Sequence, residues 1–275
     1  MSLKKVQKCL FPVAGYGTRF LPATKAVPKE MLPVLDKPLI HYGVKEAVDA
    51  NLSEMNLITG RNKESIENYF DKNYEVETEL AGTKKEVFLT EIRDLISKTT
   101  FTFRRQGAMK GLGHAIFKAK TMIGDEPFGV ILPDDICDGF EESVMSQMVS
   151  VYEKYQCSVV AIMEVPKERI SKYGVIEGTQ EEEGVFRVSS MVEKPEPEDA
   201  PSNLAIIGRY ILTPDIFDIL EKTEAGVGGE IQITDALLEQ AKQGKVVAYK
   251  FKGRRFDCGN VDGYVEAINY FYNKK

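Results

Sequence analysis

The hydrophobic positions of this chain form two successive patterns. In the first half, short apolar runs of strand length alternate with segments whose apolar residues recur at helical spacing. The strand-like runs are residues 6–14, 54–59, 101–105, 128–132 and 157–165. The helical segments are residues 39–51, 63–72, 111–122 and 141–155. Strands that alternate with helices are typical of right-handed β-α-β units, so this half predicts a parallel sheet.

The second half contains strand-like segments separated by turn residues, followed by helical segments. The strand-like segments are residues 173–177, 185–193, 204–212 and 245–252, and the helical ones are 214–222, 231–244 and 261–273. We therefore predict an α/β fold with a Rossmann-like, mixed, mostly parallel central sheet flanked by helices. The chain is expected to form one domain, residues 1–275, whose second half closes over the first. The highly charged segment 75–98 predicts helices that form an insertion or a partner surface.

Composition and charge argue against nucleic-acid binding, membrane insertion and secretion. Lys and Arg number 36 against 42 Asp and Glu, and neither this balance nor a basic stripe indicates nucleic-acid binding. No apolar run approaches the roughly 18 residues of a membrane span. The N-terminal segment lacks the apolar core of a secretion signal, so we expect a cytoplasmic protein without membrane contact. The four cysteines lie far apart and show neither zinc nor disulfide spacing.

A glycine-rich turn directly follows the first predicted strand. Gly15 and Gly17 allow backbone N–H groups to approach phosphate oxygens. The turn is not a dinucleotide fingerprint, because Phe20 stands where the third glycine would be, and no Gly-Lys-Ser/Thr of a P-loop follows. Taken alone, it is equally well explained as a plain strand-to-helix turn.

The residues after this turn favour phosphate binding. Arg19, Lys25 and Lys29 lie in a short stretch that three prolines keep from forming a regular helix. The cations are therefore expected on a constrained loop beside the glycine turn. A solvated basic loop is the alternative interpretation.

Two aspartates, Asp134 and Asp135, follow the buried run 128–132. The carboxyl ends of parallel strands are where α/β sheets place ligands. Mg²⁺ prefers one or two protein carboxylates together with phosphate oxygens and water. A magnesium site is one interpretation, and an ordinary aspartate turn after a strand is the other.

Three further segments also have a structural explanation when only their residues are considered. On this interpretation Glu193 and Lys194 form a surface ion pair, and such a pair contributes little to folding stability. Residues 106–113 are a strand followed by a helix that begins at a glycine. Residues 257–260 are explained by turn and cap chemistry.

Residues 14–34 read AGYGTRFLPATKAVPKEMLPV, which resembles the signature loop of the sugar nucleotidyltransferases, G-x-G-T-R followed by P-K. The PKEMLPV ending is most similar to the bacterial uridylyltransferase branch of that family. The LPDD segment suits the same branch, although many relatives have G-D-x there. The resemblance extends from about Val6 to about Ala267. It implies a nucleotide-diphospho-sugar transferase fold, with a nucleotide-binding part at about 1–135 and a sugar-binding, closing part at about 136–275.

The resemblance also implies a role for each motif. Arg19 and Lys29 are expected to be catalytic and to face the triphosphate, and Asp134 and Asp257 are expected to bind Mg²⁺. The residues expected to bind substrate are Ala14, Gly15, Glu30, Gln106 and Gly111 for the nucleoside, and Gly174, Glu193, Lys194 and Glu230 for the sugar phosphate. A glutamine amide has the donor and the acceptor that the edge of uracil requires.

The activity implied by the resemblance is Mg-dependent transfer of a uridylyl group from UTP to glucose 1-phosphate, giving UDP-glucose and pyrophosphate. A thymidylyl- or adenylyltransferase of the same fold and a non-catalytic nucleotide-sensing subunit are the alternatives. Relatives commonly form dimers or tetramers, so a homodimer or homotetramer is expected. His41 lies on a mixed helix face and His114 follows a glycine pair, so a structural role is expected for both. This fits the implied reaction, because a phosphate monoester with a second pKa of about 6 needs no general base.

Overall fold

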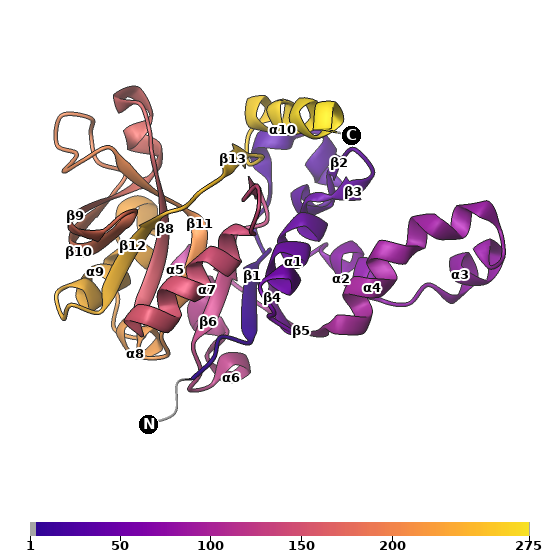
Figure 1. The fold of residues 1–275 in the computed structure, drawn as a ribbon, viewed down its shortest axis with the longest axis horizontal. Helices are drawn as coiled ribbons and strands as arrows, with labels where there is room; N and C mark the ends of the chain where they lie inside the picture. The colour runs from indigo at the N-terminus through magenta and orange to yellow at the C-terminus, as the bar shows by residue number, and fades with distance from the viewer. Residues whose placement is uncertain (1–3, 275) are drawn as a thin grey trace.

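The computed structural model describes residues 4–274 and has a nine-stranded sheet at its centre (Figure 1). The strands lie in the order β5-β4-β1-β6-β11-β8-β12-β10-β9. In chain order they are β1 (Lys8–Pro12), β4 (Glu54–Thr59), β5 (Thr100–Arg105), β6 (Phe128–Ile131), β8 (Ser158–Glu164), β9 (Gly174–Glu182), β10 (Val185–Glu193), β11 (Leu204–Leu212) and β12 (Val246–Lys250). The nine segments predicted as strands are confirmed, although β9 is longer than expected.

The central sheet is mixed, as predicted, but it is not mostly parallel. Strands β5, β4, β1 and β6 run parallel to one another, and β12 is parallel to β8. Strand β11 runs antiparallel between β6 and β8, and β10 runs antiparallel between β12 and β9. Strands β9 and β10 are joined by a tight turn at Gly184, which has a positive φ, and a tight turn can join only antiparallel strands. The predicted parallel majority is therefore corrected.

Helices cover both faces of this sheet, so its inner strands are buried on both sides. Cys9 and Phe11 of β1 pack into one core with α1 (Leu39–Asp49) and α7 (Val144–Tyr155). Leu10 faces the opposite core, which includes α5 (Leu112–Lys118), α8 (Ile216–Leu220) and α9 (Ile233–Ala241). Alternate residues of a strand point to opposite faces, which explains why β1 appears in the sequence as a continuous apolar run. A short helix, α6 (Lys120–Ile123), continues α5.

A smaller layer closes one end of the sheet. Strand β7 (Asp135–Asp138) pairs with β13 (Arg254–Asp257), and the C-terminal helix α10 (Val261–Lys274) packs against this pair (Figure 1). Strands β2 (Pro33–Val34) and β3 (Lys37–Pro38) form a third, two-stranded sheet. Helix α10 has 14 residues, and nowhere in residues 4–274 is a helix long and apolar enough to cross a membrane.

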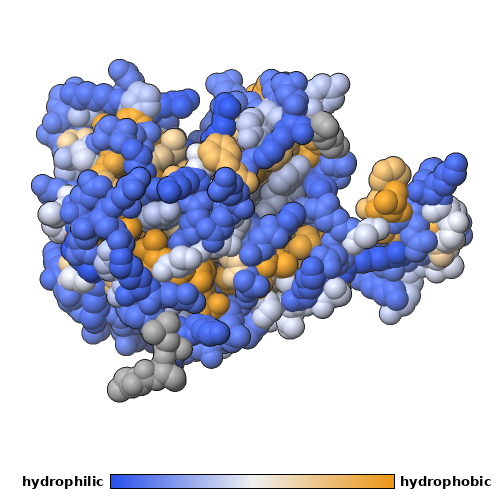
Figure 2. Space-filling view, in the orientation of Figure 1, coloured by the Kyte–Doolittle hydropathy of each residue, from blue (hydrophilic) through white to orange (hydrophobic). Residues whose placement is uncertain are grey.

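The charged segment 75–98 forms helices, as predicted, and they extend away from the body of the molecule (Figure 1). This arm contains α3 (Tyr74–Leu80), the 3-10 segment η4 (Lys84–Leu89) and α4 (Thr90–Lys98), and it follows α2 (Glu64–Phe70), whose Ile66 and Phe70 are buried in the core of the body. Hydrophobic residues are exposed on it (Figure 2). The exposed large hydrophobic side chains of the arm are Tyr74, Val76, Val87 and Phe88, the last of which is 77% exposed.

Candidate active site

The loop after β1 consists of short 3-10 segments in place of a regular helix, as its prolines predict. The segments are η1 (Thr18–Phe20), η2 (Ala23–Lys25) and η3 (Lys29–Met31). Gly17 begins the first segment with φ of 66°, a conformation that favours glycine, and its carbonyl accepts a 2.7 Å hydrogen bond from the Thr24 hydroxyl. A Cβ at Gly17 would lie 3.1 Å from Cβ of Lys29, and one at Gly15 would lie 3.9 Å from Cε of Lys29. The lysine side chain therefore lies along the glycine turn.

Lys29 points from this loop to the turn after β6. Its Nζ donates a 2.6 Å hydrogen bond to Oδ2 of Asp134. Burial alone would raise the pKa of Asp134, but the nearby Lys29 ammonium outweighs it and holds that pKa below its usual value. The pKa of Lys29 is correspondingly raised, because Asp134 more than offsets the effect of burial. The structure thus brings the predicted catalytic cation and the predicted metal ligand into contact.

Asp257 and Arg19 reach the same point from other parts of the chain. A Cβ at Gly259 would lie 3.0 Å from Oδ2 of Asp134, 3.0 Å from Oδ1 of Asp257 and 3.5 Å from Nη1 of Arg19. Because both carboxylate oxygens lie 3.0 Å from this one point, Asp134 and Asp257 are close neighbours in the structure. Arg19 also donates a 3.4 Å hydrogen bond to the carbonyl of Gly259, and the Gly259 N–H donates to Asp257.

These carboxylates fit a divalent cation that also binds phosphate. In residues 4–274 there is no cluster of three or more His, Cys, Asp or Glu side chains able to hold a metal ion. A structural zinc site, which needs four such side chains, is therefore absent from the described residues. Mg²⁺ is instead bound by one or two carboxylates, with phosphate and water oxygens completing its octahedron. Asp134 and Asp257 supply that number of carboxylates.

The predicted nucleoside residues lie at the carboxyl ends of β1, β4 and β5. Gly60, which follows β4, is so close to Ala14 that a Cβ on it would lie 2.9 Å from the Ala14 carbonyl oxygen. Gln106, next after β5, donates from its side-chain amide to the Gly111 carbonyl at 3.3 Å and contacts Nδ1 of His114 at 3.0 Å. The predicted residues Ala14, Gln106 and Gly111 are brought together here.

Glu30 comes to the same end of the sheet, through a partner that sequence reasoning missed. It is 0% exposed, and its Oε2 accepts a 2.7 Å hydrogen bond from Nζ of buried Lys63, which follows β4. Burial raises the pKa of Glu30 although Lys63 opposes that shift. Its other oxygen, Oε1, is buried without a hydrogen-bond partner. A buried acceptor of this kind is costly unless a ligand donates to it, as a nucleobase N–H would.

The predicted sugar-phosphate residues form a second group. Gly174 and Glu193 face each other across the β9–β10 pair, and a Cβ at Gly174 would lie 3.2 Å from Oε2 of Glu193. Lys194 contacts Oε1 of Glu193 at 3.1 Å and has a positive φ of 47°. Thr234 completes the group, because its hydroxyl donates to Oε2 of Glu193 and its methyl group faces Gly174. Glu230 lies elsewhere, beside Gly111, where a Cβ on the glycine would be 2.7 Å from Cβ of Glu230.

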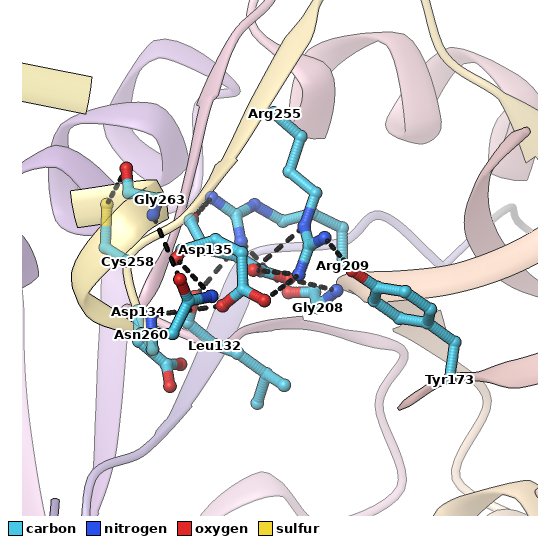
Figure 3. A network of polar contacts seen from close by, with 12 residues as sticks. Leu132, Asp134, Asp135, Tyr173, Gly208, Arg209, Arg255, Cys258, Asn260 and Gly263 are labelled. Carbon is cyan, nitrogen blue, oxygen red and sulfur yellow. Dashed lines mark hydrogen bonds and ion pairs between the residues drawn. The ribbon is translucent and has the colours of Figure 1, made fainter. Parts of the chain in front are cut away.

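A buried ion pair is hydrogen-bonded to the backbone of the LPDD turn, residues 132–135. Arg209 of β11 is 1% exposed and donates two hydrogen bonds to the Glu46 carboxylate, at 2.9 and 2.8 Å. It also donates to the carbonyls of Leu132 and Asp135, at 3.2 and 2.6 Å, and so fixes the backbone on either side of Asp134 (Figure 3). Sequence reasoning missed this pair. The available signal was a single arginine inside a nine-residue strand that is otherwise apolar.

The nucleotidyl transferase family model matches residues 12–274, and the chain belongs to this family. The UTP–glucose-1-phosphate uridylyltransferase of Pseudomonas aeruginosa is 62% identical to it, over 97% of this chain and 96% of the relative. A crystal structure of a UDP-glucose pyrophosphorylase complexed with UDP-glucose is 57% identical with a TM-score of 0.92, covering 98% of this chain and 100% of that one. A UTP-bound UGPase from Acinetobacter baumannii is 40% identical with a TM-score of 0.90, covering 98% and 94%. The predicted family and enzyme class are confirmed.

Proposed function

We propose that this protein transfers a uridylyl group from UTP to α-D-glucose 1-phosphate, giving UDP-glucose and pyrophosphate. The observation that carries the proposal is the convergence of Arg19, Lys29, Asp134 and Asp257 around the glycine turn and Gly259. The names and bound ligands of the similar proteins support the choice of UTP and of glucose. The nucleotide-binding part is residues 1–135 and the sugar-binding, closing part is 136–275. Of these, residues 1–3 and 275 lie outside the described residues.

The chemical difficulty of this reaction is repulsion between two phosphate groups. At about 4 Å, two like unit charges repel by about 1 kcal/mol in water and by several times more in a drier cleft. The sugar phosphate is already a dianion near neutral pH, so its oxygen attacks the α-phosphorus without a general base. Arg19 and Lys29 offset the charge of the triphosphate and hold it in line with that oxygen. A Mg²⁺ ion held by Asp134 and Asp257 would supply further positive charge to the phosphate oxygens.

The remaining predicted residues orient the two substrates. Backbone groups at Ala14 and Gly15 meet the nucleoside, and the amide of Gln106 with the backbone of Gly111 reads the edge of the base. Glu30 accepts from the base N–H through its buried, unpartnered Oε1.

At the other end, Glu193 accepts from sugar hydroxyls, and Lys194 neutralises the sugar phosphate. Gly174 offers a backbone contact there. Glu230 is expected from the resemblance to contact a sugar hydroxyl, but its position beside Gly111 favours the nucleoside side of the site.

A pyrophosphate-release assay with glucose 1-phosphate and UTP, dTTP or ATP tests the proposal directly. UTP is expected to be the preferred nucleotide, and EDTA is expected to stop the reaction until Mg²⁺ is added back. Faster turnover with dTTP or ATP would establish the thymidylyl- or adenylyltransferase alternative. No turnover with any nucleotide, under conditions where UTP binds, would indicate a nucleotide-sensing subunit.

The protein is proposed to act as a homodimer or homotetramer in the cytoplasm. The arm supports self-association, because its four exposed hydrophobic side chains would be costly to leave in water. The described cysteines are all free thiols, as is usual in a reducing compartment. Light scattering of the wild type and of Phe88→Asp, which places a charge on the arm, tests the assembly. A wild-type monomer would refute it.

A further inference from the structure

Arg255 contacts groups on both sides of the candidate site (Figure 3). Its Nε and Nη2 donate to Oδ1 of Asp135 at 2.9 and 2.5 Å, and its Nη2 lies 3.8 Å from Oδ2 of Asp257. Its Nη1 donates a 3.0 Å hydrogen bond to the hydroxyl of Tyr173. One guanidinium therefore joins the two segments that carry the carboxylate pair to a residue of the sugar-binding part.

The carboxylate side of this connection is held rigidly. Asp135 is opposite Asp257 in the β7–β13 pair, so the backbone ladder already fixes the two segments relative to each other. The second oxygen of Asp135 accepts a 2.8 Å hydrogen bond from the Gly208 N–H. The side chains of Arg255 and Asp135 are each only 8% exposed, so this ion pair is little screened by water.

On the sugar side, Arg255 contacts Tyr173. The guanidinium of Arg255 lies over the Tyr173 ring, 5.2 Å from its centroid. The Tyr173 carbonyl accepts a 2.9 Å hydrogen bond from the N–H of Lys194, and the next residue along the chain is Gly174. Tyr173 thus connects Arg255 to both strands of the β9–β10 pair, at the end where Gly174 is opposite Glu193.

We propose that Arg255 is a positioning residue, which sets the placement of the Gly174 and Lys194 segments relative to the Asp134–Asp257 carboxylate pair through its hydrogen bond to Tyr173. This inference rests on the proposed function, because it concerns the alignment of the sugar phosphate with the α-phosphate of UTP. Arginine suits the role because its planar fork donates to a carboxylate and a hydroxyl at once, which a lysine ammonium on a flexible stem does poorly.

The test compares Tyr173→Phe, Arg255→Lys, the double variant and the control Arg254→Ala. Tyr173→Phe removes one hydroxyl and keeps the ring under the guanidinium, so it is expected to fold. Arg254 is the preceding residue of β13 but is exposed, donates to Glu266 at 2.8 Å and lies over the Phe256 and Tyr270 rings. The control therefore removes a neighbouring arginine without touching Tyr173.

The expected result is a selective effect on the sugar phosphate. Tyr173→Phe should raise KM for glucose 1-phosphate roughly tenfold, while KM for UTP and calorimetric binding of UTP alone change by less than about twofold. Arg255→Lys should do the same with a larger loss of kcat. The double variant should be little worse than Arg255→Lys, because both changes break one connection. Arg254→Ala should keep both KM values.

Other results would overturn the inference. Equal changes in the two KM values, additive effects in the double variant, or an unchanged KM for glucose 1-phosphate in Tyr173→Phe would each show that Arg255 is only structural. Assaying the wild type in parallel distinguishes a failure of the proposed function from a failure of the positioning role. If it does not turn over UTP and glucose 1-phosphate, the proposed function fails, whereas an active wild type with unaffected variants refutes only the positioning role.

Discussion

Replacing Gly259 with alanine adds one methyl group between the two carboxylates that we propose to bind magnesium. The new Cβ would lie 3.0 Å from Oδ2 of Asp134 and 3.0 Å from Oδ1 of Asp257. The backbone at Gly259 is outside the left-handed region, so alanine causes no backbone strain there. The substitution therefore perturbs the carboxylate pair without removing any charge or hydrogen-bonding group.

The size of the effect follows from these distances. Close carbon–oxygen contacts in proteins are about 3.3–3.6 Å, so each oxygen must move away by about 0.3 Å or more. Mg²⁺ requires near-ideal octahedral geometry with oxygens at about 2.0–2.1 Å. Disturbing groups that orient metal ligands typically costs about 10–100-fold in metal affinity, or roughly 1.4–2.7 kcal/mol. We expect a loss of that size for Gly259→Ala.

The assay is the initial rate as a function of free Mg²⁺ at saturating UTP and glucose 1-phosphate. Mn²⁺ binding in the presence of UTP, followed by electron paramagnetic resonance, gives a second measure that does not depend on turnover. Asp262→Ala is the matched control, because it removes an exposed carboxylate three residues further along the chain. Thermal unfolding establishes that both variants are folded.

A folded Gly259→Ala variant with the Mg²⁺ dependence and rate of the wild type would refute this reasoning. It would mean that the space between Asp134 and Asp257 is not where the cation binds. An equal loss of Mg²⁺ affinity in Asp262→Ala would also count against it, since the effect would then reflect the general negative charge of the region.

Three further predictions concern other parts of the molecule. Lys194→Ala should raise KM for glucose 1-phosphate about tenfold or more and change KM for UTP little, and equal losses in steady-state assays would contradict its assignment. Glu46→Gln should lower the free energy of unfolding in urea by about 3–5 kcal/mol, because it leaves the Arg209 charge buried and unpaired. Asp49→Asn, at an exposed pair, should cost less than about 1 kcal/mol, and similar losses in both variants would refute the distinction. Burial lowers the pKa of His41, so the imidazole binds a proton more readily in the unfolded chain than in the folded one. The free energy of unfolding should therefore fall as the pH drops below about 6.5, the ordinary pKa of histidine. In urea melts, His41→Gln should weaken this pH dependence.

Much of the nucleotide side of the site could be predicted because its parts are close in sequence. The glycine turn and Lys29 belong to one loop, and the prolines within it restrict its path. Asp134 follows a buried strand, and the rule that ligands bind at the carboxyl ends of parallel strands applied to it directly. The structure adds the 2.6 Å contact between Lys29 and Asp134, which neither motif shows alone.

Residues whose role depends on distant partners could not be found in this way. The sequence predicts no more for Lys63 than the start of a helix, yet its ammonium is the buried partner of Glu30. Thr234 belongs to the segment of Glu230, but nothing in the sequence predicts that its hydroxyl donates to Glu193 of the β9–β10 pair. The direction of β11 also escaped prediction, because apolar spacing reveals that a strand is buried but not which neighbours it pairs with.

By itself, the sequence determined which segments become strands and helices, because hydrophobic periodicity, prolines and turn glycines act over only a few residues. It also determined the chemistry of each motif, since the charges and carboxylates are carried by the residues themselves. Only the tertiary structure decided that Arg19 reaches Gly259, 240 residues away, beside Asp134 and Asp257. The physical reason is that the order and direction of the strands depend on burying both faces of one sheet at once. That burial involves contacts between segments far apart in the chain, so no single segment reveals it.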